Sequence, residues 1–99
     1  MSARPPDTIV VGPHSYALRF APLVADDEDL FGHADHRAAT IVCRTNMSRS
    51  QQQDTVLHEV LHCALVQTTH DNEKLVWQLA PILLDTLQRN PQLVRYLTT

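Results

Sequence analysis

The stretch from Thr55 to Leu65 limits what this chain can fold into more than any other part of it. It reads T-V-L-H-E-V-L-H-C-A-L, with two histidines four residues apart and a glutamate directly after the first. On an α-helix, residues i and i+4 lie one above the other on the same face. The imidazoles of His58 and His62 can therefore reach one metal ion, as a zinc site requires. Glu59 is rotated about a third of a turn from His58, so it can hold a water on that ion but cannot bind the ion itself.

The surroundings of this H-E-x-x-H pattern favour a metal site over a chance match. A chain with six His and three Glu in 99 residues contains the pattern in roughly one shuffled copy in a hundred. The flanking residues are mostly apolar, so we expect a helix that is buried on most sides. Burying a histidine without a bonding partner costs free energy, and a shared metal ion would be a partner for both histidines. The alternative is a pair of core histidines satisfied by hydrogen bonds, with Glu59 in an ion pair.

The composition narrows the class of protein. Ninety-nine residues with 43% hydrophobic side chains are enough for one domain with a modest core. A net charge of −3 without any run of Lys or Arg argues against a nucleic-acid-binding surface. No apolar stretch approaches the ~20 residues that span a bilayer, and residues 1–7 lack the hydrophobic block of a signal peptide. Cys43 and Cys63 are then expected to be buried free thiols in a cytoplasmic protein.

The segments before the motif predict the sheet of an α+β fold. After a flexible tail at residues 1–7, residues 8–12 and 16–20 predict a hairpin, and Ala39–Arg44 predicts a further strand. Residues 22–36 predict loops and turns. Three polar residues at the end of this stretch are further candidate ligands, namely His33, Asp35 and His36. We therefore expect a small antiparallel or mixed sheet of about three strands.

The segments from residue 48 onward predict the helices that pack on this sheet. Ser48 and Gln51 fit a capping box, so the motif helix should begin near residue 49 and run to about Thr68. A second long helix should follow from about residue 72 and continue through Pro81 with a bend. Pro91 should begin a short last helix. Residues 8–99 would thus form a single domain.

Two histidines leave a zinc site short of a third protein ligand. A short link between helices normally makes them antiparallel neighbours, which would bring Glu73, in the first turn of the second helix, near His62. The resulting His₂Glu set with one open position is the arrangement of catalytic zinc sites. Asp71 and His70 are alternative ligands, and Cys43 is a further candidate contact. Glu73 could instead only interact with the positive end of the helix dipole.

At these residues the chain resembles the zincin metallopeptidases, whose active-site helix carries H-E-x-x-H. It is most similar to the gluzincin branch, which takes its third ligand from a glutamate on the next helix. Asn72-Glu73 matches the start of the N-E-x-x-x-D element found there, whereas the aspartate position is Trp77. A different group must then orient the zinc histidines, and Asp54, one turn before His58, is a candidate. The layout as a whole resembles the minimal gluzincins and the ImmA/IrrE-like peptidase domains, some of them encoded by phages.

The resemblance implies a zinc-dependent metallopeptidase that hydrolyses peptide bonds through a zinc-bound water activated by Glu59. The implied ligands of Zn²⁺ are His58, His62 and Glu73. It also implies that strand 39–44 offers its edge to an extended peptide or protein substrate, and that Tyr96 or His70 stabilises the oxyanion. The alternative is a zinc-stabilised interaction or regulatory module that keeps the ligands and cleaves nothing.

Overall fold

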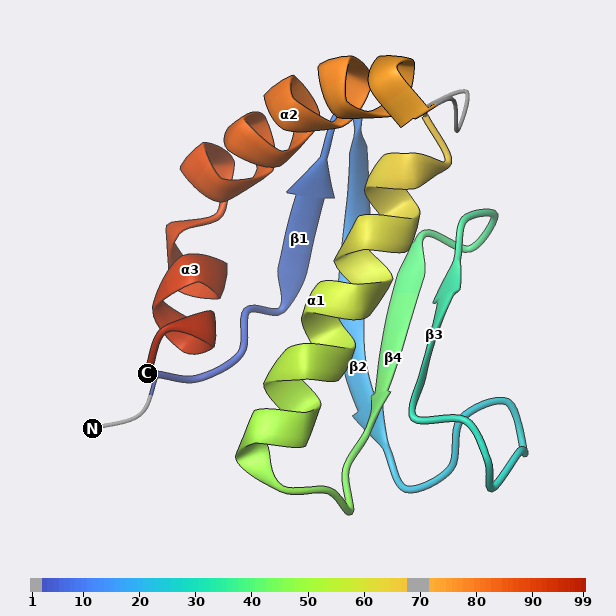
Figure 1. The fold of residues 1–99 in the computed structure, drawn as a ribbon. Coiled ribbons are helices and arrows are strands. Elements are labelled where there is room, and N and C mark those ends of the chain that lie inside the picture. The colour runs from blue at the N-terminus through green and yellow to red at the C-terminus, as the bar shows by residue number, and fades with distance from the viewer. Residues whose placement is uncertain (1–2, 68–71) are drawn as a thin grey trace.

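The computed structural model describes residues 3–67 and 72–99, and within the second helix it leaves out the side chains of residues 72–74, 76 and 77. The described residues form an α+β fold, as expected (Figure 1). Its strands are β1 (Thr8–Val11), β2 (His14–Ala21), β3 (Gly32–Asp35) and β4 (Thr40–Arg44). Its helices are α1 (Arg49–Leu65), α2 (Asn72–Arg89) and α3 (Pro91–Leu97).

The strands form one mixed sheet in the order β1-β2-β4-β3. β1 and β2 form the predicted antiparallel hairpin, β2 runs parallel to β4, and β4 runs antiparallel to β3. The hairpin turns at Gly12, whose φ of 60° favours glycine. A Cβ at this position would also collide with the side-chain amide of Gln67.

The expectation of loops and turns throughout residues 22–36 is wrong, because Gly32–Asp35 is a strand. Its sequence is G-H-A-D, and a single apolar residue gives neither the alternation nor the β-branched enrichment by which strands are predicted. The strand is defined by its pairing, which runs from Gly32 opposite Cys43 to Asp35 opposite Thr40. The described sheet therefore has four strands instead of about three.

The expectation that strand 39–44 offers a free edge is also wrong. The strand exists as β4, but it pairs with β2 on one side and with β3 on the other. The sheet ends instead at β1 and β3. At β1 the side-chain amide of Asn90 occupies the edge, because Val10 N donates to Asn90 Oδ1 at 3.0 Å and Asn90 Nδ2 donates to Val10 O at 2.9 Å. The edge of β3 carries no such cap among the described residues.

Helix α1 lies across one face of the sheet (Figure 1). It begins where the capping box predicts, since Gln51 N donates to Ser48 Oγ and Ser48 N donates to Gln51 Oε1. Its buried side contains Val56, Val60, Cys63 and Ala64. These pack on inward-facing residues of the strands, including Ile9, Val11, Tyr16, Leu18, Ile41 and Cys43. The expectation of a helix buried on most sides is wrong, because Leu57, His58 and His62 are exposed.

Helix α2 continues through Pro81, as predicted. It does not run back along α1, however: it begins beside the C-terminal end of α1 and crosses above β1 (Figure 1). Only its first turn therefore stays near the motif helix. Helix α3 begins at Pro91, as predicted. None of the helices in the described ranges is both long and apolar enough to cross a membrane.

The N-terminal segment, expected as a flexible tail, is bonded to the body of the protein from Ala3 onward. Ala3 N donates to Thr99 Oγ1 at 3.0 Å, and Arg49 Nη2 donates to Ala3 O at 2.7 Å. Cys43 and Cys63 are buried free thiols, as predicted. Burial raises the pKa of each thiol to about 11, so both stay protonated and unreactive at neutral pH.

Candidate metal centre

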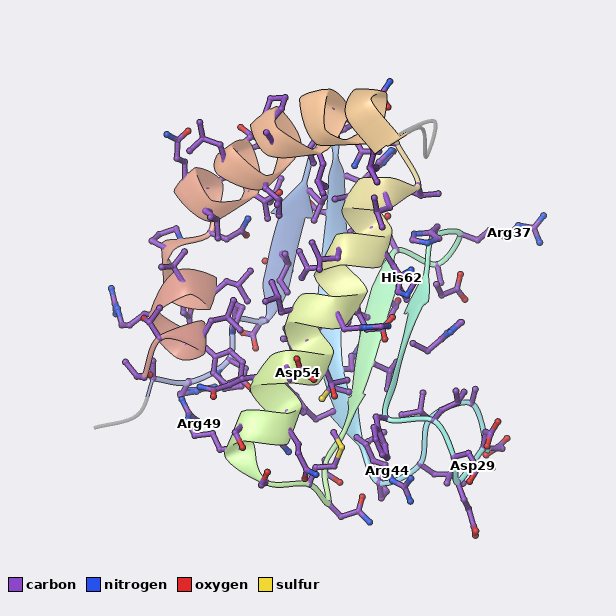
Figure 2. The ribbon with its side chains drawn as sticks, in the orientation of Figure 1. Asp29, Arg37, Arg44, Arg49, Asp54 and His62 are labelled. Carbon is purple, nitrogen blue, oxygen red and sulfur yellow. The ribbon has the colours of Figure 1, made fainter. Side chains whose placement is uncertain are left out.

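His58 and His62 form a pair on the exposed side of α1. Their Nε2 atoms lie 3.1 Å apart, and their ring centroids are separated by 4.7 Å. Figure 2 shows His62 on the side of α1 that faces β3. The helix produces this pairing directly, because residues four apart stack on one face. The predicted convergence of the two imidazoles is thus observed.

The distance between the two nitrogens suits a zinc ion. Two nitrogens bound tetrahedrally at ~2.0–2.1 Å from Zn²⁺ lie about 3.3–3.4 Å from each other. The observed 3.1 Å is within a few tenths of an ångström of that value, so small rotations of the rings would suffice. Both imidazoles are exposed. They are therefore not the buried histidines that the apolar flanks led us to expect.

The buried titratable group of the motif is Glu59, whose residue is only 7% exposed. Its carboxylate lies between α1 and β3, with Oε2 3.2 Å from the position that a Cβ on Gly32 would occupy. It forms no hydrogen bond or ion pair with any residue in the described ranges, so the ion pair of the alternative interpretation is not seen. A buried carboxylate with unused acceptor capacity is unusual in a structural role.

A groove runs between α1 and β3, and we call it the β3 groove. On one side of His58 it opens into a cavity of about 250 Å³ lined by Leu30–Gly32, Asp54, Thr55 and Glu59. On the other side a cavity of about 370 Å³ is lined by His36, Glu59 and His62 among others. Glu59 and His58 contact both cavities. Because the two cavities share these lining residues, the histidine pair and the buried carboxylate both face the β3 groove.

Gly32 allows β3 to lie this close to the motif helix. A Cβ on Gly32 would lie 2.6 Å from Thr55 Cγ2 and 3.1 Å from the backbone oxygen of Val42. Because Thr55 is buried and short, it cannot swing away, and one of the two elements would have to shift. The absence of a side chain at residue 32 thus sets the width of the β3 groove.

We expect Gly32→Ala to lower the free energy of unfolding by about 1–3 kcal/mol through overpacking. Thr55→Ser removes the Cγ2 atom that the new methyl meets, so the double variant should be more stable than the sum of the single effects predicts. Urea unfolding of the four proteins measures this coupling. Thr8→Ser, at an exposed position in β1, provides the control and should show no coupling with Gly32→Ala.

The third ligand stays a prediction. The structure places Glu73 in the first turn of α2, but its side chain, like His70 and Asp71 as a whole, lies outside the described residues. Within the described ranges, no three His, Cys, Asp or Glu side chains are grouped closely enough to hold a metal ion. The described structure therefore does not support four of the other candidate ligands, namely Cys43, His33, Asp35 and His36.

Two supporting roles suggested by the sequence do not match the structure. Tyr96 is completely buried and stacks under Arg49, with 5.0 Å from the guanidinium carbon to the ring centroid. Arg49 lies at the N-terminal end of α1, toward α3, whereas His62 lies near the other end (Figure 2). Tyr96 therefore does not face the β3 groove. Asp54 lines the groove with His58, but the two side chains share no hydrogen bond in the part of the chain that is described.

One pair of residues near the site was not predicted. Tyr16 Oη lies 3.1 Å from His36 Nδ1, and the rings meet edge to face with centroids 6.0 Å apart. Alternation along β2 predicts that Tyr16 points inward, but nothing local links it to residue 36. His33 and Asp35 alternate with Gly32 and Ala34, which face α1, so they point to the other face of the sheet. Of the three loop candidates, His33 and His36 both line the groove beside His62, and His36 also lines the cavity at the C-terminal end of α1.

The arrangement brings together two imidazoles whose geometry fits zinc, a buried carboxylate that accepts no hydrogen bond from the described part of the chain, and an open groove beside a sheet edge. Comparisons of this chain with protein-family models, with curated proteins and with solved structures find no match in any of the three.

Proposed function

We propose that this protein is a zinc-dependent metallopeptidase. The observation that carries the proposal is the pairing of His58 and His62, with 3.1 Å between their Nε2 atoms. Beside them lies the buried Glu59, which has no hydrogen-bond partner among the described residues. A helix that needed these residues only for stability would not place a buried carboxylate, unpaired within the described ranges, next to two exposed imidazoles. The same set is what hydrolysis of a peptide bond requires.

The residues that would hold the ion are His58, His62 and Glu73. The first two fit by distance, and the third fits by its place in the first turn of α2, beside the end of α1. Zn²⁺ bound there would supply a Lewis acid that polarises a peptide carbonyl and lowers the pKa of a water molecule toward ~7. Nitrogen and carboxylate donors in this combination, with one position open, suit zinc in a catalytic site.

Glu59 would act as the general base and then as the general acid. Its carboxylate faces the groove and accepts nothing from the described protein, so it is free to take a proton from the attacking water. Delivery of that proton to the amine nitrogen completes the cleavage. Burial between α1 and β3 holds the carboxylate in place, because Gly32 and Thr55 pack around it.

The substrate would be an extended peptide paired with the free edge of β3. Arg44 N donates to Phe31 O at 2.8 Å, and hydrogen-bonded pairs alternate along an antiparallel ladder. Residues 33 and 35 therefore bond to β4, while the backbone groups of Gly32 and Ala34 point to the open edge. An added strand there would lie along the β3 groove and pass the histidine pair.

The direct test combines metal analysis with proteolysis. The purified protein should contain close to one zinc per chain, and His62→Ala should lose it. Hydrolysis of a mixed-sequence peptide library should stop with a chelator and return when zinc is added. His14→Ala, which removes an exposed histidine at the start of β2, is the matched control. Protein that binds no zinc, or library cleavage that survives metal removal, would contradict the proposal.

A further inference from the structure

A buried tyrosine holds His36 at the wall of the β3 groove. Tyr16 is 2% exposed, and its Oη lies 3.1 Å from His36 Nδ1. Tyr16 belongs to β2, and His36 lies in the turn from β3 to β4. Because β4 pairs with both strands, the sheet itself fixes the distance between the two residues. The imidazole is therefore exposed yet anchored on one side.

The chemistry of the neighbouring groups assigns a direction to this hydrogen bond. Burial raises the pKa of Tyr16 to about 12, so the hydroxyl keeps its proton at neutral pH. The thiol of Cys63 is a second polar neighbour of this hydroxyl, and sulfur is a weak acceptor compared with an imidazole nitrogen. We therefore assign the hydroxyl as the donor and Nδ1 as the acceptor. Nε2 must then carry the ring proton, which makes it a donor and not a metal ligand.

This donor belongs to the same cavity as the proposed catalytic residues. His36 lines the cavity of about 370 Å³ together with His58, Glu59 and His62. No Lys or Arg lines that cavity among the described residues. Peptide hydrolysis builds negative charge on the carbonyl oxygen, and a fixed N–H donor near that oxygen is the usual means of stabilising it. Two residues that line this cavity, His33 and His36, carry such a donor. His36 is the one whose ring is held by a hydrogen bond from the sheet, through Tyr16.

We propose that His36 is the oxyanion donor of the β3 groove and that Tyr16 is its positioning residue. The inference rests on the proposed peptidase function. As the water oxygen bonds to the carbonyl carbon, Nε2–H of His36 donates to the carbonyl oxygen. The water's proton goes to Glu59 and then to the amine nitrogen as the C–N bond breaks. His36 keeps its own proton throughout.

Two inhibitors of zinc-loaded protein separate this role from others. A phosphonamidate dipeptide presents anionic oxygens in place of the tetrahedral carbonyl, whereas a thiol dipeptide binds the metal through sulfur and presents none. His36→Ala should weaken phosphonamidate binding about 100-fold, the size of effect seen for one oxyanion donor, and leave thiol binding within about twofold. Tyr16→Phe should weaken phosphonamidate binding by about tenfold, because the ring loses its fixed tautomer.

His36→Gln keeps an N–H donor and should restore part of the loss, while His14→Ala should change neither affinity. The role of His36 is overturned if His36→Ala loses zinc, or if the substitution weakens the binding of both inhibitors equally. It is also overturned if phosphonamidate affinity does not change. If zinc-loaded wild-type protein binds neither probe, the proposed function itself fails, and the role of His36 fails with it.

Discussion

Replacing Glu59 with Gln should abolish peptide hydrolysis while the protein keeps its zinc and becomes more stable. General acid–base groups contribute about 10²–10⁴-fold to rate, so kcat should fall by that factor. Glu59 is buried and has no hydrogen-bond partner among the described residues. Its carboxylate therefore does not stabilise the folded state as a paired carboxylate would. A neutral amide of the same shape should raise the free energy of unfolding by about 1–2 kcal/mol.

The measurements are kcat on a cleaved library peptide, zinc per chain, and urea unfolding of metal-free protein. Glu28→Gln, at an exposed position in the loop before β3, is the matched control and should alter none of them. If Glu59→Gln lost stability, Glu59 would have a structural partner and the assignment as general base would be wrong. If zinc and biological effect both survived the substitution, the non-catalytic interaction module would be the better interpretation.

The motif helix could be predicted almost completely because its signals are local. The capping box at Ser48 and Gln51 fixes the start, and the four-residue spacing fixes the meeting of His58 and His62. What the sequence could not show is which side of the helix is buried. The apolar flanks suggested burial on most sides, whereas the sheet covers only the side that contains Val56 and Val60.

The β3 groove could not be predicted because it depends on pairing between distant segments. Residues 32–35 form a strand through their contact with β4, and Gly32 allows the close approach to Thr55. The same dependence explains why strand 39–44 was wrongly expected to have a free edge. The hydrogen bond between Tyr16 and His36 joins residues 20 apart, and no pattern in either segment indicates it. A role can be inferred for such residues only after the sheet order is known.

Zinc should raise the unfolding temperature of this protein by about 15–30 °C. A ligand at a thousand times its Kd stabilises the folded state by about 4 kcal/mol, and each kcal/mol shifts the midpoint by roughly 4–8 °C in a domain of this size. The histidine pair is already near the geometry of bound zinc, so little of the binding energy is spent on rearranging the rings. Thermal unfolding with and without a chelator measures the shift.

The same measurement identifies the third ligand. Loss of one ligand should cost at least tenfold in affinity, or about 1.4 kcal/mol, so Glu73→Ala should reduce the zinc-dependent shift by at least about 5 °C. The metal-free midpoint should change little, since residue 73 lies in the first turn of α2. Glu28→Ala should leave the shift intact. If Glu73→Ala kept the full shift while His70→Ala or Asp71→Ala lost it, the ligand would come from the link between the helices, and the likeness to gluzincins would not extend to the third ligand.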